Sequence, residues 1–116
     1  MKFKYASMAA VAILLTANSA MATDMPVLAR KNNCIACHAI DHKVVGPAWM
    51  DVSKKYKNAT TYNYRGKEYP LFEGLVMKVS RGGSGNWGSM PMPGNAPAVK
   101  DEDIRQLVKF VLELAK

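Results

Sequence analysis

Four side chains that could bind a metal or a cofactor lie within one short segment, "CIACHAIDH" at residues 34–42. The segment holds both cysteines of the chain, Cys34 and Cys37, and both histidines, His38 and His42. A C-x-x-C pair can be a disulfide, a redox dithiol, half of a zinc site or an anchor for haem. Structural zinc usually takes two separated ligand pairs, and a thioredoxin-like dithiol stands beside a βαβ sheet. Since the sequence shows neither pattern, zinc, a dithiol and a plain disulfide remain only as alternatives.

C-x-x-C followed directly by histidine is the attachment motif of c-type haem. On one helical turn, Cys34 and Cys37 lie on the same side and can form thioethers with the two vinyl groups of one porphyrin. His38 then projects beneath the iron and donates a ring nitrogen. The motif therefore predicts one covalent haem c, with His38 as an iron ligand.

The second iron ligand should come from a distant part of the chain. His42 follows His38 too closely, because the intervening residues cannot pass around the edge of the macrocycle, and we expect it at the surface. The segment "SMPMPGN" at 89–95 contains Met90 and Met92, whose place in a loop is not explained by core packing. This segment is the predicted source of a methionine ligand.

The first 22 residues have the composition of a secretory signal peptide. Lys2 and Lys4 precede an almost wholly apolar run, and "SAMA" at 19–22 offers a cleavage site after Ala22. The apolar run is short for a membrane span, although an uncleaved N-terminal anchor is the alternative. We therefore expect export to the periplasm, a single domain over 23–116, and no stable membrane insertion after cleavage.

The charge of the expected domain is basic. The chain has 16 Lys and Arg against 9 Asp and Glu; two of the lysines precede residue 23, and 14 minus 9 leaves +5. The lysines are scattered, which fits an acidic protein partner, an anionic membrane surface or simply a solvated face. Export argues against nucleic acid as a partner. So small a domain also has difficulty burying enough apolar surface without a disulfide, metal or cofactor.

The pattern of apolar residues predicts a mostly helical domain. Asp24 can cap a first helix, with Pro26 in its opening turn, and this helix is expected to run on into the C-x-x-C-H motif. The final segment has the clearest helical period, with an acidic first turn that suits the helix dipole. The further helices are predicted over 47–57, 70–80 and 101–116.

Two segments do not follow a helical pattern. Residues 58–69 alternate tyrosines with polar residues around Arg65-Gly66, which fits either a small hairpin or an ordered loop. Residues 81–98 are rich in glycine and proline and are expected to form a loop without regular structure, ordered by Trp87 and its methionines. The prediction is an all-α domain of about four short helices, with a long Gly/Pro/Met loop before the last one.

Taken in order, "CIACHAI", "VGPAW", "GSGNWGSMPMPGN" and the apolar C-terminal helix resemble small monohaem bacterial class I cytochromes c of the cytochrome c-551/c-552 type. The resemblance covers nearly all of 23–116. It implies a cytochrome c fold wrapped around one covalent haem, with thioethers from Cys34 and Cys37. It also implies His38 as the proximal iron ligand and Met92 as the axial methionine.

The resemblance assigns roles to four further residues. The carbonyl of Pro47 is expected to accept a hydrogen bond from His38 and fix its tautomer. Asn95 is expected close to the ligand sulfur, and Trp87 and Lys78 near the haem propionates. The chain departs from the family pattern at Gly94, where the second of two prolines is expected, which would loosen the methionine loop.

A second departure is the segment between Tyr56 and Leu75, about nine residues longer than in compact family members. It contains the three tyrosines Tyr62, Tyr64 and Tyr69. It could contact a partner or cover the haem edge, or it could be a purely structural insertion.

The expected function is that of a soluble periplasmic one-electron carrier rather than an enzyme. Histidine and methionine together leave the iron no open position, so electron transfer is favoured over chemistry at the metal. Partners would be redox proteins with an acidic docking surface, and the carrier itself a monomer. The alternative is a haem enzyme or gas-binding sensor with a weak or displaceable methionine, for which Gly94 is the supporting feature.

Overall fold

The computed structural model describes residues 23–116. The predicted signal peptide, residues 1–22, lies outside the described residues. Four α-helices carry most of the regular structure: α1 (Val27–Lys31), α2 (Trp49–Lys55), α3 (Leu71–Arg81) and α4 (Asp101–Glu113). Two small antiparallel hairpins accompany them, β1 (Thr61–Tyr64) with β2 (Lys67–Pro70) and β3 (Gly83–Gly85) with β4 (Gly88–Met92). Within the described part of the chain, no helix has the length and hydropathy needed to cross a membrane.

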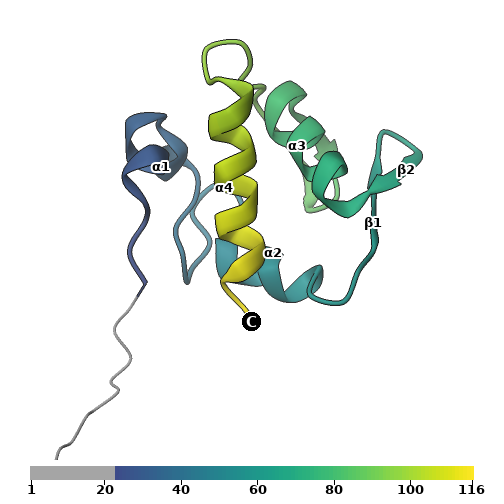
Figure 1. Ribbon diagram of the computed structural model, residues 1–116, viewed down its shortest axis with the longest axis horizontal. Coiled ribbons are helices and arrows are strands. Elements are labelled where there is room, and N and C mark those ends of the chain that lie inside the picture. Colours follow the sequence, from purple (N-terminus) through teal and green to yellow (C-terminus); the bar gives the residue numbers. More distant parts are fainter. Residues whose placement is uncertain (1–22) are drawn as a thin grey trace, which may run out of the picture.

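Helix α4 is the centre of the fold. Figure 1 shows it between α1 and α3, with α2 crossing near its end. Its predicted apolar stripe is confirmed, since four side chains on one face are buried: Ile104, Leu107, Val108 and Val111. They pack with buried residues of the other elements, including Ala29, Trp49 and Leu75, in a single core.

The first helix is much shorter than predicted. Its N-cap is Pro26 rather than Asp24, and no side chain caps it. It ends at Lys31 because Asn33 adopts a left-handed conformation with φ of 65°, which asparagine tolerates better than most residues. The chain then restarts as a separate 3-10 turn over Cys34–Ala36. The C-x-x-C-H motif therefore begins a new turn instead of extending α1.

Residues 81–98 were expected to lack regular structure, and this expectation is wrong for the first half of the segment. Strands β3 and β4 pair there, with Gly83 opposite Met92 and an irregularity in register between Gly83 and Gly85. Both of these glycines have positive φ, at 130° and 116°, a backbone conformation that side-chain-bearing residues rarely adopt. The sequence of this hairpin has no alternation of hydrophobic and polar residues, so the usual signal for a β-strand is missing.

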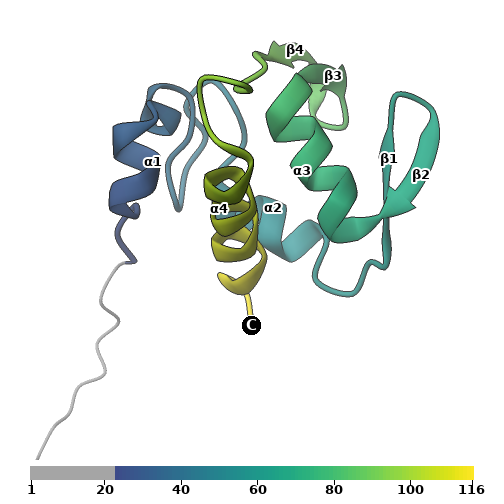
Figure 2. The same cartoon turned by 45° about the horizontal axis from the view of Figure 1, so that its top comes forward.

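Of the two structures predicted for 58–69, the hairpin forms. Arg65 and Gly66 make its turn with φ of 54° and 85°, the sign pattern of a tight two-residue connection. Tyr62 and Tyr64 alternate with exposed neighbours and are buried against α3. Figure 2 shows both hairpins beside α3, the second one at its C-terminal end.

Candidate functional site

His38 is held by the loop that follows it. The backbone N–H groups of Val45 and Gly46 donate to the carbonyl of Cys37, at 3.2 and 2.8 Å, so the chain turns back on itself. This return brings the carbonyl oxygen of Pro47 within 2.8 Å of Nδ1 of His38, which donates the hydrogen bond. Burial lowers the pKa of His38, and the bond to Pro47 opposes that effect. In the neutral ring, which burial favours, Nδ1 carries the proton that it donates to Pro47, and Nε2 has the free lone pair.

The two cysteines are unpaired and partly buried beside this histidine. The 3-10 turn joins them, because the N–H groups of Cys37 and His38 both donate to the carbonyl of Cys34, at 3.1 and 3.0 Å. Burial is the largest cause of a raised pKa for the Cys34 thiol. All three side chains border one cavity, so the local turn alone delivers them to the same place.

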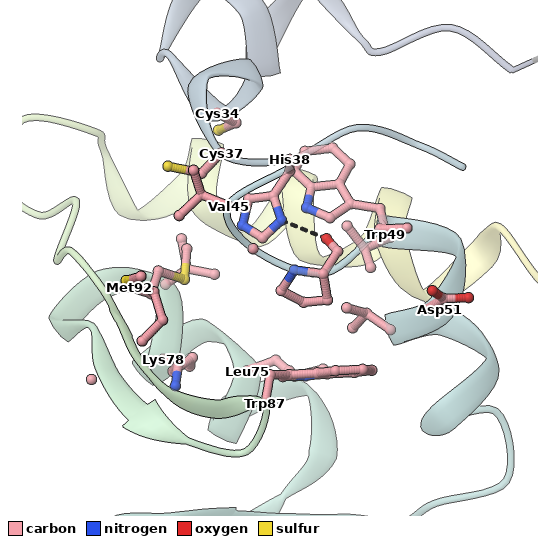
Figure 3. Close-up of a pocket in the computed structure, with 18 of the residues that line it drawn as sticks. Cys34, Cys37, His38, Val45, Trp49, Asp51, Leu75, Lys78, Trp87 and Met92 are labelled. Carbon is pink, nitrogen blue, oxygen red and sulfur yellow. Dashed lines mark hydrogen bonds between the residues drawn. The ribbon is translucent and has the colours of Figure 1, made fainter. Parts of the chain in front are cut away.

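That cavity has a volume of about 290 Å³, near the lower end of the range of roughly 300–1,000 Å³ for small-molecule pockets. Met92 borders it from β4, and Figure 3 shows Met92 with Lys78 and Trp87 on the side away from the two cysteines. Most of the remaining wall is apolar and comes from α2, α3 and α4, including Val52, Leu75, Val79, Leu107, Val108 and Val111.

The two candidate methionines differ in burial. Both border the cavity, but Met90 is 64% exposed, whereas Met92 is half-buried. They lie two residues apart in β4 and so share one face of the strand. Met92 is the one residue of this strand that is not exposed. The burial difference favours Met92 as the side chain held in place.

Lys78 and Trp87 both border the cavity. Burial lowers the pKa of Lys78, with a smaller contribution from the positive charge of Arg65. The Trp87 ring is 40% exposed and lies 4.5 Å, centroid to nitrogen, beneath Nζ of Lys55. Lys78 and Trp87 therefore provide the cavity wall with a cation and an indole ring that carries an N–H donor.

Asn95 follows the methionine strand in sequence and is not among the residues that border the cavity. Its side-chain amide donates to the carbonyls of Val79 and Pro93, at 3.0 and 3.3 Å. The structure therefore shows Asn95 tying the segment after Met92 to α3.

Gly94 has a packing reason that the sequence did not reveal. A β carbon at this position would lie 3.0 Å from the carbonyl oxygen of Arg81 and 3.1 Å from that of Ser80. The glycine lets the chain approach the end of α3 closely, which is a packing role that the sequence did not predict.

The alternatives to a haem anchor find no support in the described residues. Within 23–116, no three His, Cys, Asp or Glu side chains are grouped so as to hold a metal ion. His42 is exposed and pairs with Asp41 at 2.9 Å, as its expected surface position requires. Both sheets over this range are two-stranded and antiparallel, which excludes a thioredoxin-like βαβ setting there.

Sequence reasoning missed Gly46 and named Tyr62 only as part of a segment that could cover the haem edge. Tyr62 borders the cavity, and a β carbon at Gly46 would lie 2.6 Å from Cε1 of His38. The alternation of tyrosines with polar residues in 61–64 was a signal for the burial of Tyr62. Nothing in the local sequence distinguishes Gly46 from an ordinary turn glycine.

The cavity, its histidine and its two free thiols are those of a haem-binding domain with a covalent attachment site. Residues 26–115 match the cytochrome c family, and the chain belongs to that family. It is 43% identical to cytochrome c-551 of Allochromatium vinosum over 88 residues, covering 76% of this chain and 83% of the relative. It is also 43% identical to cytochrome c-552 of Nitrosomonas europaea over 90 residues, covering 75% of each.

The structure agrees with these sequence matches. The crystal structure of Nitrosomonas europaea cytochrome c552 superposes with a TM-score of 0.61 at 41% identity, covering 73% of this chain and 93% of that one. Family membership and the C-x-x-C-H motif together mean that the protein carries one covalently bound haem c. Its c-551 and c-552 relatives are electron carriers and not enzymes, and the predicted family, fold and cofactor are confirmed.

The residues present fit that group. The thiols of Cys34 and Cys37 are free for thioether formation, and the bond from Nδ1 of His38 to Pro47 leaves Nε2 as the nitrogen available for a metal. The cavity is walled largely by apolar side chains, as a porphyrin body requires, and has a cation in Lys78.

Proposed function

We propose that the protein is a periplasmic one-electron carrier whose haem iron is ligated by His38 and Met92. The observation that carries the proposal is the convergence on one cavity of His38, fixed by Pro47, and Met92, delivered by a strand from a distant part of the chain. When bound, the haem supplies the one-electron redox chemistry, and the protein sets its potential, burial and access.

His38 is prepared for ligation by its backbone partner. Because Nδ1 donates to Pro47, the lone pair is on Nε2, and the hydrogen bond raises the basicity of the ring. Gly46 and Trp49 restrict the ring further, Trp49 with a centroid separation of 5.7 Å. The residues around His38 therefore orient its ring before any metal is bound.

Met92 is the second ligand in this proposal. A thioether is a soft ligand, and the Met/His pair raises the reduction potential relative to harder ligand sets. With both positions taken, a substrate cannot coordinate, which favours electron transfer. The apolar wall from α2, α3 and α4 would disfavour water beside the bound haem.

Lys78 and Trp87 serve the acidic edge of the haem in this proposal. Lys78 is a partly buried cation, and the propionates would supply the negative charges that such a cation needs. The indole N–H of Trp87 is a donor suited to a carboxylate.

Partner docking would use the exposed apolar side chains near the motif. Ile35, Val44 and Val45 are each 45–47% exposed, and Lys31 and Lys43 are exposed cations close to them in sequence. Apolar contact ringed by positive charge suits a small, fast-dissociating complex with an acidic surface on a redox protein.

The test of ligation is spectroscopic. The oxidised protein should show the weak methionine-dependent absorption band at the red end of the visible spectrum, and the reduced protein should not bind carbon monoxide at neutral pH. Absence of the band together with carbon monoxide binding would favour a sensor or a haem enzyme instead.

The test of location is the mature N-terminus. Protein purified from the periplasmic fraction should begin at Thr23, as measured by intact mass with one haem attached. A membrane-bound protein that keeps its first 22 residues would contradict the proposal of export and cleavage.

A further inference from the structure

The methionine strand needs support that it does not provide for itself. Strand β4 is exposed over most of its length, and the hairpin contains several glycines with positive φ. Two-stranded hairpins are marginally stable alone, and glycine adds backbone entropy that must be lost on ordering. Whatever holds this hairpin also determines where Met92 lies.

Tyr64 of the inserted β1–β2 hairpin contacts the base of the β3–β4 hairpin, next to Gly82. The hydroxyl of Tyr64 donates to the carbonyl of Gly82 at 2.8 Å, and this bond is buried. Gly82 in turn lies against the backbone next to Met92. A β carbon there would collide with the Met92 carbonyl oxygen and lie 2.6 Å from the Gly94 nitrogen. One hydroxyl thus connects the insertion to the backbone of the proposed ligand.

A second connection is made at the turn of the β3–β4 hairpin, where Asn86 lies. The hydroxyl of Tyr62 donates to Oδ1 of Asn86 at 2.8 Å, and Nδ2 of Asn86 donates back to the carbonyl of Asn63 at 3.1 Å. Lys55 adds a bond from Nζ to the carbonyl of Asn86, at 3.0 Å, while lying over the Trp87 ring. The turn of β3–β4 is therefore fixed by side chains from β1 and α2.

The inserted hairpin is itself well anchored. Tyr62 is 2% exposed, and a β carbon at Gly74 of α3 would lie 2.8 Å from its Cβ, so the strand packs directly on the helix. The turn is closed by the N–H of Gly66, which donates to the side chain of Asn63 at 3.1 Å. A strand seated in this way can hold a weaker hairpin.

We propose that Tyr62 and Tyr64 are positioning residues that hold the β3–β4 hairpin and thereby set the placement of Met92. The insertion is then neither a partner-contact element nor a passive addition, but a support for the ligand strand. The effect on the haem iron rests on the proposed ligation by Met92. The support of the β3–β4 hairpin by the two tyrosines does not depend on that ligation.

The experiment compares three tyrosine-to-phenylalanine variants of the haem-loaded protein. Tyr64→Phe and Tyr62→Phe each remove one hydroxyl and keep the buried ring. Tyr69→Phe is the matched control on the same hairpin, because the Tyr69 hydroxyl makes no hydrogen bond within residues 23–116. Imidazole is titrated into the oxidised protein as a competitor for the methionine position, and amide hydrogen exchange is followed across 82–92.

We expect Tyr64→Phe to raise the apparent affinity for imidazole by roughly fivefold to tenfold, the range that the loss of one hydrogen bond implies. Hydrogen exchange across 82–92 should accelerate by a similar factor, and Tyr62→Phe should act in the same direction. Tyr69→Phe should leave both quantities within about twofold of the wild type. If Tyr62→Phe and Tyr64→Phe both behave like Tyr69→Phe, the proposal is overturned.

Failure of the ligation and failure of the support are distinguishable. If the wild type lacks the methionine-dependent band, ligation by Met92 is wrong, and hydrogen exchange alone then decides whether the tyrosines hold the hairpin. If the band is present but exchange does not change in either variant, ligation stands and the supporting role of the tyrosines is wrong.

Discussion

The backbone of Gly46 lies against the imidazole of His38, so closely that a β carbon would stand 2.6 Å from Cε1, 3.1 Å from Nδ1 and 3.2 Å from Nε2. No other residue type fits there without moving the ring. Because the next residue, Pro47, accepts the hydrogen bond from His38, the glycine and the proline act together on one side chain.

Gly46→Ala should therefore displace the His38 ring and break its bond to Pro47. Loss of an outer partner of a metal-binding histidine typically costs about 10- to 100-fold in metal affinity or activity. We expect the yield of haem-loaded protein to fall about tenfold, measured as haem absorbance per polypeptide. Val44→Ala, at an exposed position nearby, is the control, and an unchanged yield in Gly46→Ala would contradict the assigned contact.

Met92→Ala and Met90→Ala should separate the two methionines of β4. Since the thioether attachments remain, Met92→Ala should keep its haem, but it should lose the methionine band and bind carbon monoxide. Its potential should fall by on the order of 0.1 V or more, within the roughly 0.8 V range that axial ligands span. Met90→Ala, at a 64% exposed side chain, should change little. Loss of the band in Met90→Ala would assign the ligand to Met90.

Gly74→Ala should destabilise the protein although it places alanine in a helix. Alanine gains about 0.8–1 kcal/mol of helix propensity over glycine, but a β carbon here would lie 2.8 Å from Cβ of Tyr62. Overpacking of this kind typically costs about 1–3 kcal/mol, so we expect a net loss of roughly 1 kcal/mol by urea unfolding. Ser80→Ala, on the same helix, is the control. A gain in stability for Gly74→Ala would show that the Tyr62 strand can move away.

Glu73→Gln should make the free energy of unfolding depend less on pH in the acid range. Arg105 joins Glu73 of α3, at 2.7 and 3.0 Å, to Asp101 of α4, at 2.7 Å. The hydrogen bond from Arg105 is the largest cause of a lowered pKa for Glu73. As the pH falls, Glu73 therefore becomes protonated in the unfolded chain before it does so in the folded protein. The stabilisation from the ion pair is complete above the ordinary pKa of 4.5 and is lost as the pH falls through the lower pKa of the folded state.

Urea unfolding between about pH 6 and pH 3 measures this difference. The wild type should lose more stability than Glu73→Gln over the acid part of that range, and added salt should reduce the gap because the pair is exposed. Glu102→Gln is the control, as Glu102 makes no ion pair within the described range. Parallel pH profiles for the wild type and Glu73→Gln would rule out a contribution from the ion pair.

Elements with a strong local period were predictable. Helix α4 follows from the 3.6-residue spacing of Ile104, Leu107, Val108 and Val111, and α3 from a similar stripe. The first helix was predicted, but its C-terminal end was not, because one left-handed residue, Asn33, ended it early. The β3–β4 hairpin was not predictable either, since its strands hold glycines and exposed residues whose order comes from contacts elsewhere.

By itself, the sequence determined the chemistry of the site. Cys34, Cys37 and His38 stand within one turn, so their joint use is a local property that needs no tertiary contact. The tertiary structure decided what surrounds them. It brought the Pro47 carbonyl to His38, carried Met92 to the same cavity, and seated the hairpin of Tyr62 and Tyr64 against the methionine strand. The Pro47 contact spans nine residues, but the other relationships join segments farther apart in the chain, and the packing of the domain offsets the entropy of closing those longer loops.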